Sequence, residues 1–181
     1  MVFAGLDIGS VFSRAVIMEE DTIVSMTLKP TGGDFKKAVG DLLRDIRPPD
    51  RFDAFDIDTM GACGLGAAFI DHPFIKIAEL PCLSRGVHFI LPHIRSIIEV
   101  GNQYSRVVRI NDHGKVTDSL ASEKCAAGSG RILQVIANVL GIGMEELEPL
   151  AARAVRPAKF TTNCAVFLET EAISRVAEGI P

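Results

Sequence analysis

The sequence has little of what marks a secreted or membrane protein. It contains no tryptophan, one tyrosine and only four cysteines among 181 residues. Four widely spaced cysteines are too few for the disulfide scaffold of a small secreted domain. No apolar run approaches the roughly 20 residues that a membrane helix needs, and the N-terminus lacks the basic start and apolar stretch of a secretion signal. We therefore expect a cytoplasmic protein whose cysteines are thiols or metal ligands.

The charge balance also gives no sign of an electrostatic partner. The 19 basic and 23 acidic residues leave a formal net charge of −4 at pH 7, and binding to nucleic acid or an anionic membrane is typical of basic proteins. We therefore expect neither partner. With 48% hydrophobic residues, a chain of this length can bury roughly 70% of its unfolded surface, enough for one compact domain or two small lobes.

The hydrophobic pattern alternates between strand and helix signals along the chain. Short apolar runs predict strands at 2–8, 15–18, 22–28, 54–58, 96–100, 106–111, 115–121 and 158–162. Apolar residues at helical spacing predict helices at 34–46, 84–91, 132–140, 144–155 and 164–179. A flexible loop is expected at 61–66. The repeated order of strand hairpin and helix predicts an α/β chain of two related halves, 1–92 and 93–181.

Two cysteines stand out because each comes just before a predicted helix. Cys125 lies in Lys-Cys-Ala-Ala-Gly-Ser-Gly-Arg, and Cys164 lies in Asn-Cys-Ala-Val-Phe. A helix N-terminus has unpaired N–H groups and about half a positive charge, which favours an anion such as a thiolate-bound iron–sulfur cluster. Gly128 and Gly130 would let the backbone approach the cluster sulfurs and donate hydrogen bonds to them. The alternative is a glycine-rich helix entry that merely turns the chain.

Two ligands do not hold a four-iron cluster. The separation of Cys125 and Cys164 fits neither zinc-finger nor ferredoxin spacing, which use C-x-x-C-type pairs. Four thiolates require either all four cysteines of one chain or this pair from each of two chains across a twofold axis. We favour the homodimer, because Cys63 and Cys82 lack the helix-start context and are expected to be buried thiols.

Two loops have the composition of phosphate-binding turns. Asp7, Gly9 and Ser10 end the first strand with a carboxylate, a glycine and a hydroxyl, which suit phosphate and hydrated Mg²⁺. These are also common turn residues, so a plain turn is the alternative. Glu99, Gly101 and Gln103 form a similar loop at the start of the second half. No G-x-x-x-x-G-K-[ST] occurs, which excludes a P-loop enzyme.

The cysteine motifs and both loops resemble those of a known family. The sequence is similar to the ATP-dependent activators (component A) of 2-hydroxyacyl-CoA dehydratases and the related ATPase subunits of benzoyl-CoA reductase. The motifs K-C-A-A-G-[ST]-G-R and C-x-V-F-x-E-[ST]-E are long and specific. Because residues 5–10 and 99–103 fall in the family's order, the likeness spans nearly the whole chain.

The resemblance implies an actin-like, ribonuclease-H-like fold of two lobes with ATP or ADP and Mg²⁺ between them. It implies nucleotide contacts from Asp7, Gly9, Ser10, Arg14, Glu99, Gly101 and Gln103. It also implies a homodimer that shares one [4Fe-4S] cluster through Cys125 and Cys164 of each subunit, near Gly128 and Gly130. Such a protein passes electrons at low potential to a partner dehydratase or reductase iron–sulfur protein.

The sequence departs from the family pattern in the nucleotide loops. The family's second loop reads G-G-Q-D, whereas Tyr104 stands here in place of the acid. Val11 replaces threonine, and Arg14 replaces the usual lysine. The sequence stops at Pro181, before the family's adenosine loop, so we expect an incomplete second lobe.

These departures keep two other functions open. One is a shortened binding or assembly module of the same fold that does not hydrolyse ATP. The other is a small-molecule kinase on the same fold, for which Asp58 is the only candidate catalytic acid.

Overall fold

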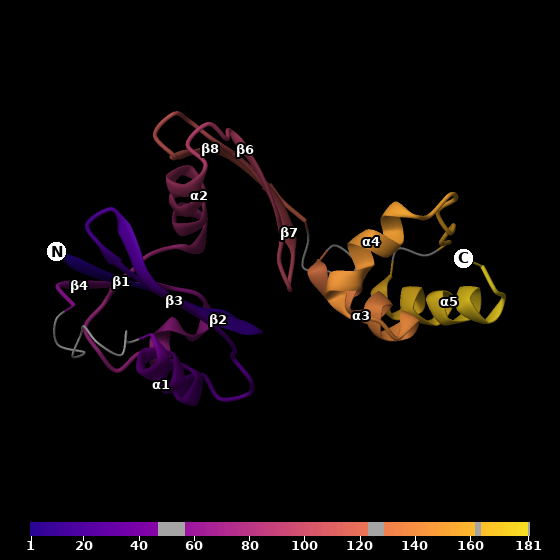
Figure 1. Cartoon of the computed structure of the whole chain (residues 1–181), viewed down its shortest axis with the longest axis horizontal. Helices are drawn as coiled ribbons and strands as arrows, with labels where there is room; N and C mark the ends of the chain where they lie inside the picture. Colours follow the sequence, from indigo (N-terminus) through magenta and orange to yellow (C-terminus); the bar gives the residue numbers. More distant parts are fainter. Residues whose placement is uncertain (47–56, 123–128, 162–163, 181) are drawn as a thin grey trace. The chain divides into compact units, whose positions relative to one another are not determined.

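The computed structural model describes residues 1–46, 57–122, 129–161 and 164–180, which form an α/β fold as predicted (Figure 1). The chain divides into two compact units. The first comprises Met1–Ile94 with Asp112–Val116, and the second Arg95–Asn111 with Thr117–Pro181. Among the described helices, none has both the length and the apolar character needed to cross a membrane.

A five-stranded sheet with the order β3-β2-β1-β4-β5 forms the framework of the first unit. The first three strands form an antiparallel meander, and the last two add in parallel beside β1. The strands are β1 (Val2–Ile8), β2 (Phe12–Glu19), β3 (Thr22–Pro30), β4 (Thr59–Cys63) and β5 (Ile75–Lys76). The predicted hairpin and third strand are therefore confirmed, with β2 beginning earlier than expected.

The core of this unit lies between the sheet and α1 (Phe35–Asp45), which packs against β1, β2 and β3 (Figure 1). Alternate side chains of β1 point to this face, because successive residues of a strand face opposite sides. Leu6 and Ile8 are buried there against Leu42 of α1. The helix begins where the Asp34 carboxylate accepts a hydrogen bond from Lys37 N at 3.0 Å.

The strand predicted at 54–58 is wrong for its last two residues. Residues 54–56 lie outside the described residues, and Ile57 and Asp58 precede β4 without belonging to it. The expected loop at 61–66 is instead the end of β4, followed by η1 (Leu65–Phe69). Its glycines allow close packing: a Cβ at Gly61 would lie 3.1 Å from Ile77 Cδ1, and one at Gly66 would lie 2.4 Å from Ile8 Cγ2.

Helix α2 (Glu79–Ile90) completes the first unit and begins earlier than the predicted helix at 84–91. Pro81 lies in its first turn, where the missing N–H would have had no partner in the helix. Arg85 Nη1 donates to the carbonyl of His113, which ties α2 to the turn of residues 112–114.

The second unit contains a three-stranded sheet, order β6-β7-β8, and a group of helices. The predicted strands are confirmed as β6 (Ser96–Val100), β7 (Ser105–Ile110) and β8 (Val116–Ala121). The helices are α3 (Gly130–Leu140), η3 (Met144–Glu146), α4 (Leu147–Ala152) and α5 (Ala165–Ala177). α3 packs against α5 (Figure 1).

Two predictions in this unit need correction. The helix predicted at 144–155 is broken into η3 and the short α4, because Pro149 lacks the N–H that a continuous helix would bond to the Glu145 carbonyl. Residues 158–161 form no strand, and Thr162 lies outside the described residues. The N–H of Thr161 donates to the side chain of Glu171 instead of to a neighbouring strand.

The core packing predicts a clear difference between two leucines of the first unit. Leu42→Ala should lower the free energy of unfolding by about 2–5 kcal/mol, because Leu42 is fully buried and its loss leaves a cavity. Leu28→Ala on β3, where the side chain is 58% exposed, should change it by less than about 0.5 kcal/mol. Urea unfolding followed by far-UV circular dichroism measures both, since the protein has no tryptophan. Equal losses would contradict this description of the core.

Candidate functional site

The first candidate loop is a tight turn between β1 and β2. Gly9 N donates to the carbonyl oxygen of Phe12 at 3.1 Å. A Cβ on Gly9 would lie 2.6 Å from that oxygen, so only glycine fits this closure. Ser10 and Val11 form the tip of the turn.

Asp7 and Arg14 face each other directly across the β1–β2 hairpin. Arg14 Nη1 lies 3.0 Å from Asp7 Oδ2, and both side chains are partly exposed. An exposed pair of this kind contributes at most about 1 kcal/mol, so a phosphate or a cation could replace either partner at little cost. The pair therefore leaves one carboxylate and one guanidinium available beside the turn.

The buried hydroxyl groups of Ser13 and Thr31 stabilise the turn. The Thr31 hydroxyl donates to Gly9 O at 2.8 Å and accepts from the Ser13 hydroxyl at 2.8 Å. Thr31 N donates to Val11 O at 2.7 Å. Sequence reasoning missed both residues, although Ser13 is a polar residue at an inward position of an otherwise apolar alternation. Thr31 was noted only because, with Gly32 and Gly33, it interrupts the apolar pattern after β3.

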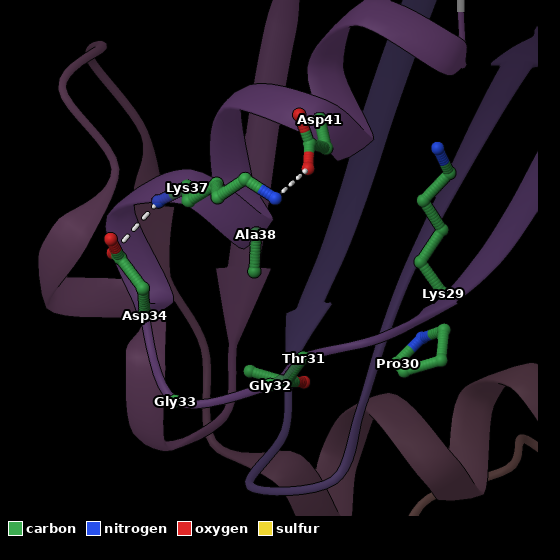
Figure 2. Close-up of a pocket in the computed structure, with 9 residues that line it drawn as sticks. All are labelled: Lys29, Pro30, Thr31, Gly32, Gly33, Asp34, Lys37, Ala38 and Asp41. Atoms are coloured by element: carbon green, nitrogen blue, oxygen red, sulfur yellow. Dashed lines mark hydrogen bonds and ion pairs between the residues drawn. The ribbon is translucent and has the colours of Figure 1, made fainter.

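A small pocket of about 210 Å³ lies beside Thr31, where β3 leads into α1 (Figure 2). Figure 2 shows Lys37 between the carboxylates of Asp34 and Asp41. The Lys37 amine pairs with Asp41 at 3.6 Å, and Lys29 pairs with Asp45. Because each lysine already has an acidic partner, the pocket offers a phosphate no uncompensated positive charge. The nine lining residues are Lys29, Pro30, Thr31, Gly32, Gly33, Asp34, Lys37, Ala38 and Asp41.

The second candidate loop repeats the closure of the first. Gly101 N donates to the carbonyl oxygen of Tyr104 at 3.0 Å, and a Cβ on Gly101 would lie 2.9 Å from that oxygen. Glu99 and Arg106 face each other across β6 and β7 and form an ion pair. Both loops thus share the pattern [DE]-x-G-x-x-[FY]-x-R, at residues 7–14 and 99–106. Sequence reasoning missed Arg106, although this shared spacing is visible in the printed sequence.

Tyr104, the residue that replaces the family's acid, is packed against the same arginine. The Arg106 guanidinium carbon lies 5.4 Å from the centre of the Tyr104 ring, a geometry that favours a cation–π interaction. Arg106 is nearly buried and Glu99 is partly exposed. The second loop therefore presents one carboxylate, that of Glu99, with its charge balanced by Arg106.

The helix that follows Cys125 begins against the second loop. Gly130 N, at the first position of α3, donates to Gly101 O at 2.7 Å. A Cβ on Gly130 would lie 3.3 Å from that oxygen. The Gly130 N–H is thus bonded to the second loop, and its contact with a cluster stays a prediction. Cys125 and Gly128 lie outside the described residues.

Cys164 occupies the start of α5, as predicted. It is the N-cap residue, its carbonyl accepts from Leu168 N at 2.8 Å, and its side chain is exposed. Val166 and Phe167 beside it are 71% and 66% exposed. Within the described residues, no three His, Cys, Asp or Glu side chains gather as metal ligands.

Cys63 has a different environment from Cys164. It ends β4, directly opposite Asp7 in the parallel register with β1, and is buried. Burial raises the pKa of its thiol well above the ordinary value, and the negative charge of Asp7 and a hydrogen bond with Cys82 raise it further. The expectation of a buried thiol is confirmed for Cys63, whereas it is wrong for Cys82, which is only partly buried.

Comparison with known proteins connects this geometry to a family. The model of the BadF/BadG/BcrA/BcrD ATPase family matches residues 4–181. The 2-hydroxyisocaproyl-CoA dehydratase activator of Clostridioides difficile is 32% identical over 181 residues, a match that covers 99% of this chain and 67% of that protein. The chain thus spans about two thirds of the length of this curated relative.

Two solved structures share the fold. The Clostridium difficile activator of the 2-hydroxyisocaproyl-CoA dehydratase with bound ADPNP has a TM-score of 0.88 at 31% identity, covering 99% of this chain and 67% of that one. Component A of the (R)-2-hydroxyglutaryl-CoA dehydratase of Acidaminococcus fermentans has a TM-score of 0.84 at 28% identity, covering 100% and 70%. These matches confirm the predicted actin-like fold.

The two thiols should differ in reactivity. In folded, iron-free protein at pH 8, iodoacetamide should label Cys164 at least about tenfold faster than Cys63, because the thiolate is the reactive form and Cys63 keeps its proton. Raising the pH to 9.5 should leave Cys63 slow, although an ordinary thiol ionises near about 8.5. Peptide mass spectrometry measures both rates, and the urea-unfolded chain is the control in which both label alike. Equal rates in the folded protein would contradict this assignment.

Proposed function

Because this chain belongs to the BadF/BadG/BcrA/BcrD ATPase family, we propose that it is an ATP-dependent activator. It donates low-potential electrons to a partner iron–sulfur enzyme of the 2-hydroxyacyl-CoA dehydratase or benzoyl-CoA reductase type. The observation that carries the proposal is the repeated glycine turn with an acid–arginine pair, in a chain that matches dehydratase activators over nearly its whole length.

Each loop is proposed to bind phosphate oxygens of ATP or ADP. The proposed contacts are Asp7, Gly9, Ser10 and Arg14 for the first loop, and Glu99, Gly101 and Gln103 for the second. Glycine at the closure of each turn permits the close approach of N–H and carbonyl that forms the turn. Backbone N–H groups of the turn residues that follow are the proposed donors to phosphate oxygens. The match to a structure with bound ADPNP supports a nucleotide as the ligand.

Asp7 is the proposed partner of Mg²⁺. Mg²⁺ keeps several waters and binds through one or two carboxylates plus phosphate oxygens. The Asp7 carboxylate fits this requirement, because it is partly exposed and its ion pair with Arg14 is exchangeable. Arg14 can then turn to a phosphate oxygen, which guanidinium groups bind well.

Cys125 and Cys164 are the proposed ligands of a [4Fe-4S] cluster shared by two subunits. Cys164 fits a ligand at a subunit interface, since its thiol is exposed and two exposed apolar residues, Val166 and Phe167, stand beside it. Such residues are suited to burial in the centre of a homodimer interface. The cluster would supply a reversible one-electron redox centre.

Coupling to ATP has an energetic reason. Raising an electron by about 300 mV costs about 7 kcal/mol, at 59 mV for each factor of ten in a one-electron equilibrium. Thermal energy does not supply this, so nucleotide binding and hydrolysis are the proposed source. The proposed homodimer works in the cytoplasm.

A non-hydrolysing binding module is the second candidate, and Tyr104 favours it. Tyr104 places an aromatic ring on Arg106 where the family pattern has an acid. Calorimetry and a phosphate-release assay separate the candidates. ATP binding without phosphate release would favour the module, whereas release of phosphate would favour the activator.

Asp7→Asn should weaken Mg²⁺-dependent ATP binding at least about tenfold, which corresponds to 1.4 kcal/mol. The physical reason is the loss of the charged oxygen proposed for Mg²⁺. Isothermal titration calorimetry with ATP, with and without Mg²⁺, measures the effect. Asp21→Asn, in the turn between β2 and β3, is the matched control and should bind like the parent chain. Unchanged affinity of Asp7→Asn would contradict the assigned site.

Protein purified without oxygen should contain about four irons per dimer, following the four-thiolate rule for such clusters. Cys125→Ala and Cys164→Ala should each lose this iron, and Cys82→Ala should keep it. Iron and sulfide analysis, with the dimer mass from light scattering, measures the outcome. If the double variant of Cys125 and Cys164 keeps its iron, these residues are not the ligands.

A further inference from the structure

Glu171 belongs to the cysteine motif, yet neither the nucleotide site nor the cluster ligands account for it. It lies about two turns into α5. Its side chain is only 14% exposed. Both carboxylate oxygens accept from Thr161 N, at 2.9 and 3.0 Å, and Oε2 also accepts from the Thr161 hydroxyl at 3.1 Å. One side chain thus binds a backbone position just before Cys164.

Arg175 fixes the orientation of this carboxylate. Its Nη2 lies 3.2 Å from Glu171 Oε1, and its Nη1 lies 3.1 Å from Glu178 Oε2. The hydrogen bonds to the two glutamates raise the pKa of Arg175. Charge-assisted bonds between partly buried groups are stronger than the usual surface contact. Arg175, one helical turn further along α5, therefore holds the Glu171 carboxylate in place while that carboxylate binds Thr161.

These contacts restrain Cys164 from both sides. On its C-terminal side, the carbonyl of Cys164 accepts the helix hydrogen bond from Leu168 N. On its N-terminal side, only two residues separate it from Thr161, which Glu171 ties to the same helix. Both flanks of the cysteine are thus anchored to α5, so its thiol is presented with less freedom than on an untethered loop.

Glu169 provides a natural comparison within the same motif. It also lies on α5, but its side chain is exposed. In the described part of the chain, its side chain makes no hydrogen bond or ion pair. The motif therefore contains one glutamate with a defined structural contact and one without it.

We propose that Glu171 is a positioning residue for Cys164: it holds the segment ending at Thr161 against α5, so that the thiol is preorganised to bind iron. This inference rests on the proposed role of Cys164 as a cluster ligand. Residues that orient metal ligands typically change metal affinity by about 10–100-fold when they are removed.

The test compares Glu171→Ala, Glu171→Gln and Glu169→Ala with the parent chain, all made without oxygen. The rate at which a chelator removes iron should rise about tenfold or more in Glu171→Ala. Glu171→Gln keeps a carbonyl acceptor and should fall between Glu171→Ala and the parent. Glu169→Ala should release iron like the parent.

A second readout uses the iron-free protein. Exchange of the Thr161 amide hydrogen, followed by mass spectrometry, should be faster in Glu171→Ala and unchanged in Glu169→Ala. Retention of the parent circular dichroism spectrum confirms that each variant folds. If the iron release of Glu171→Ala equals that of Glu169→Ala, the positioning role is overturned and the proposed function stands. If the parent chain binds no iron, the proposed cluster is overturned and the positioning role with it.

Discussion

The arrangement depends on a hydrogen bond from a glycine N–H to the carbonyl three residues further on, and this bond occurs twice. It joins Gly9 to Phe12 at 3.1 Å in the first unit and Gly101 to Tyr104 at 3.0 Å in the second. A Cβ at either glycine would collide with the accepting oxygen. The closure brings the strands on either side together, so that an acid on one faces an arginine on the other. The same turn thus produces both the backbone geometry and the charged pair of each proposed phosphate loop.

The second turn also reaches the segment proposed to hold the cluster. Gly101 uses its N–H to close the turn, while its carbonyl accepts from Gly130 at the start of α3. That helix follows the motif of Cys125 and packs against α5, which begins at Cys164. Within the second unit, a continuous series of contacts therefore leads from the proposed phosphate loop to both helices associated with the cysteines.

Much of the fold could be predicted from local pattern, because the pattern itself is the cause. Apolar residues alternate along β1 and recur at helical spacing along α1, and these are the residues that the two elements bury against each other. Residues 61–66 were predicted as a loop because of their glycines, whereas Gly61 lies in β4 close to Ile77 and Gly66 lies in η1 close to Ile8. The candidate loops were visible as short motifs. The contacts of Thr31 and Glu171 could not be predicted, although Glu171 lies in the cysteine motif, because each side chain binds a partner that only the folded chain brings close.

The central claim is that a nucleotide and an iron–sulfur cluster act together in this protein. The most direct test is the electron-paramagnetic-resonance spectrum of the dithionite-reduced, oxygen-free protein, recorded with and without Mg²⁺ and ATP. The account predicts an iron–sulfur signal whose shape changes when the nucleotide is added. No iron–sulfur signal, or the same signal under both conditions, would contradict it.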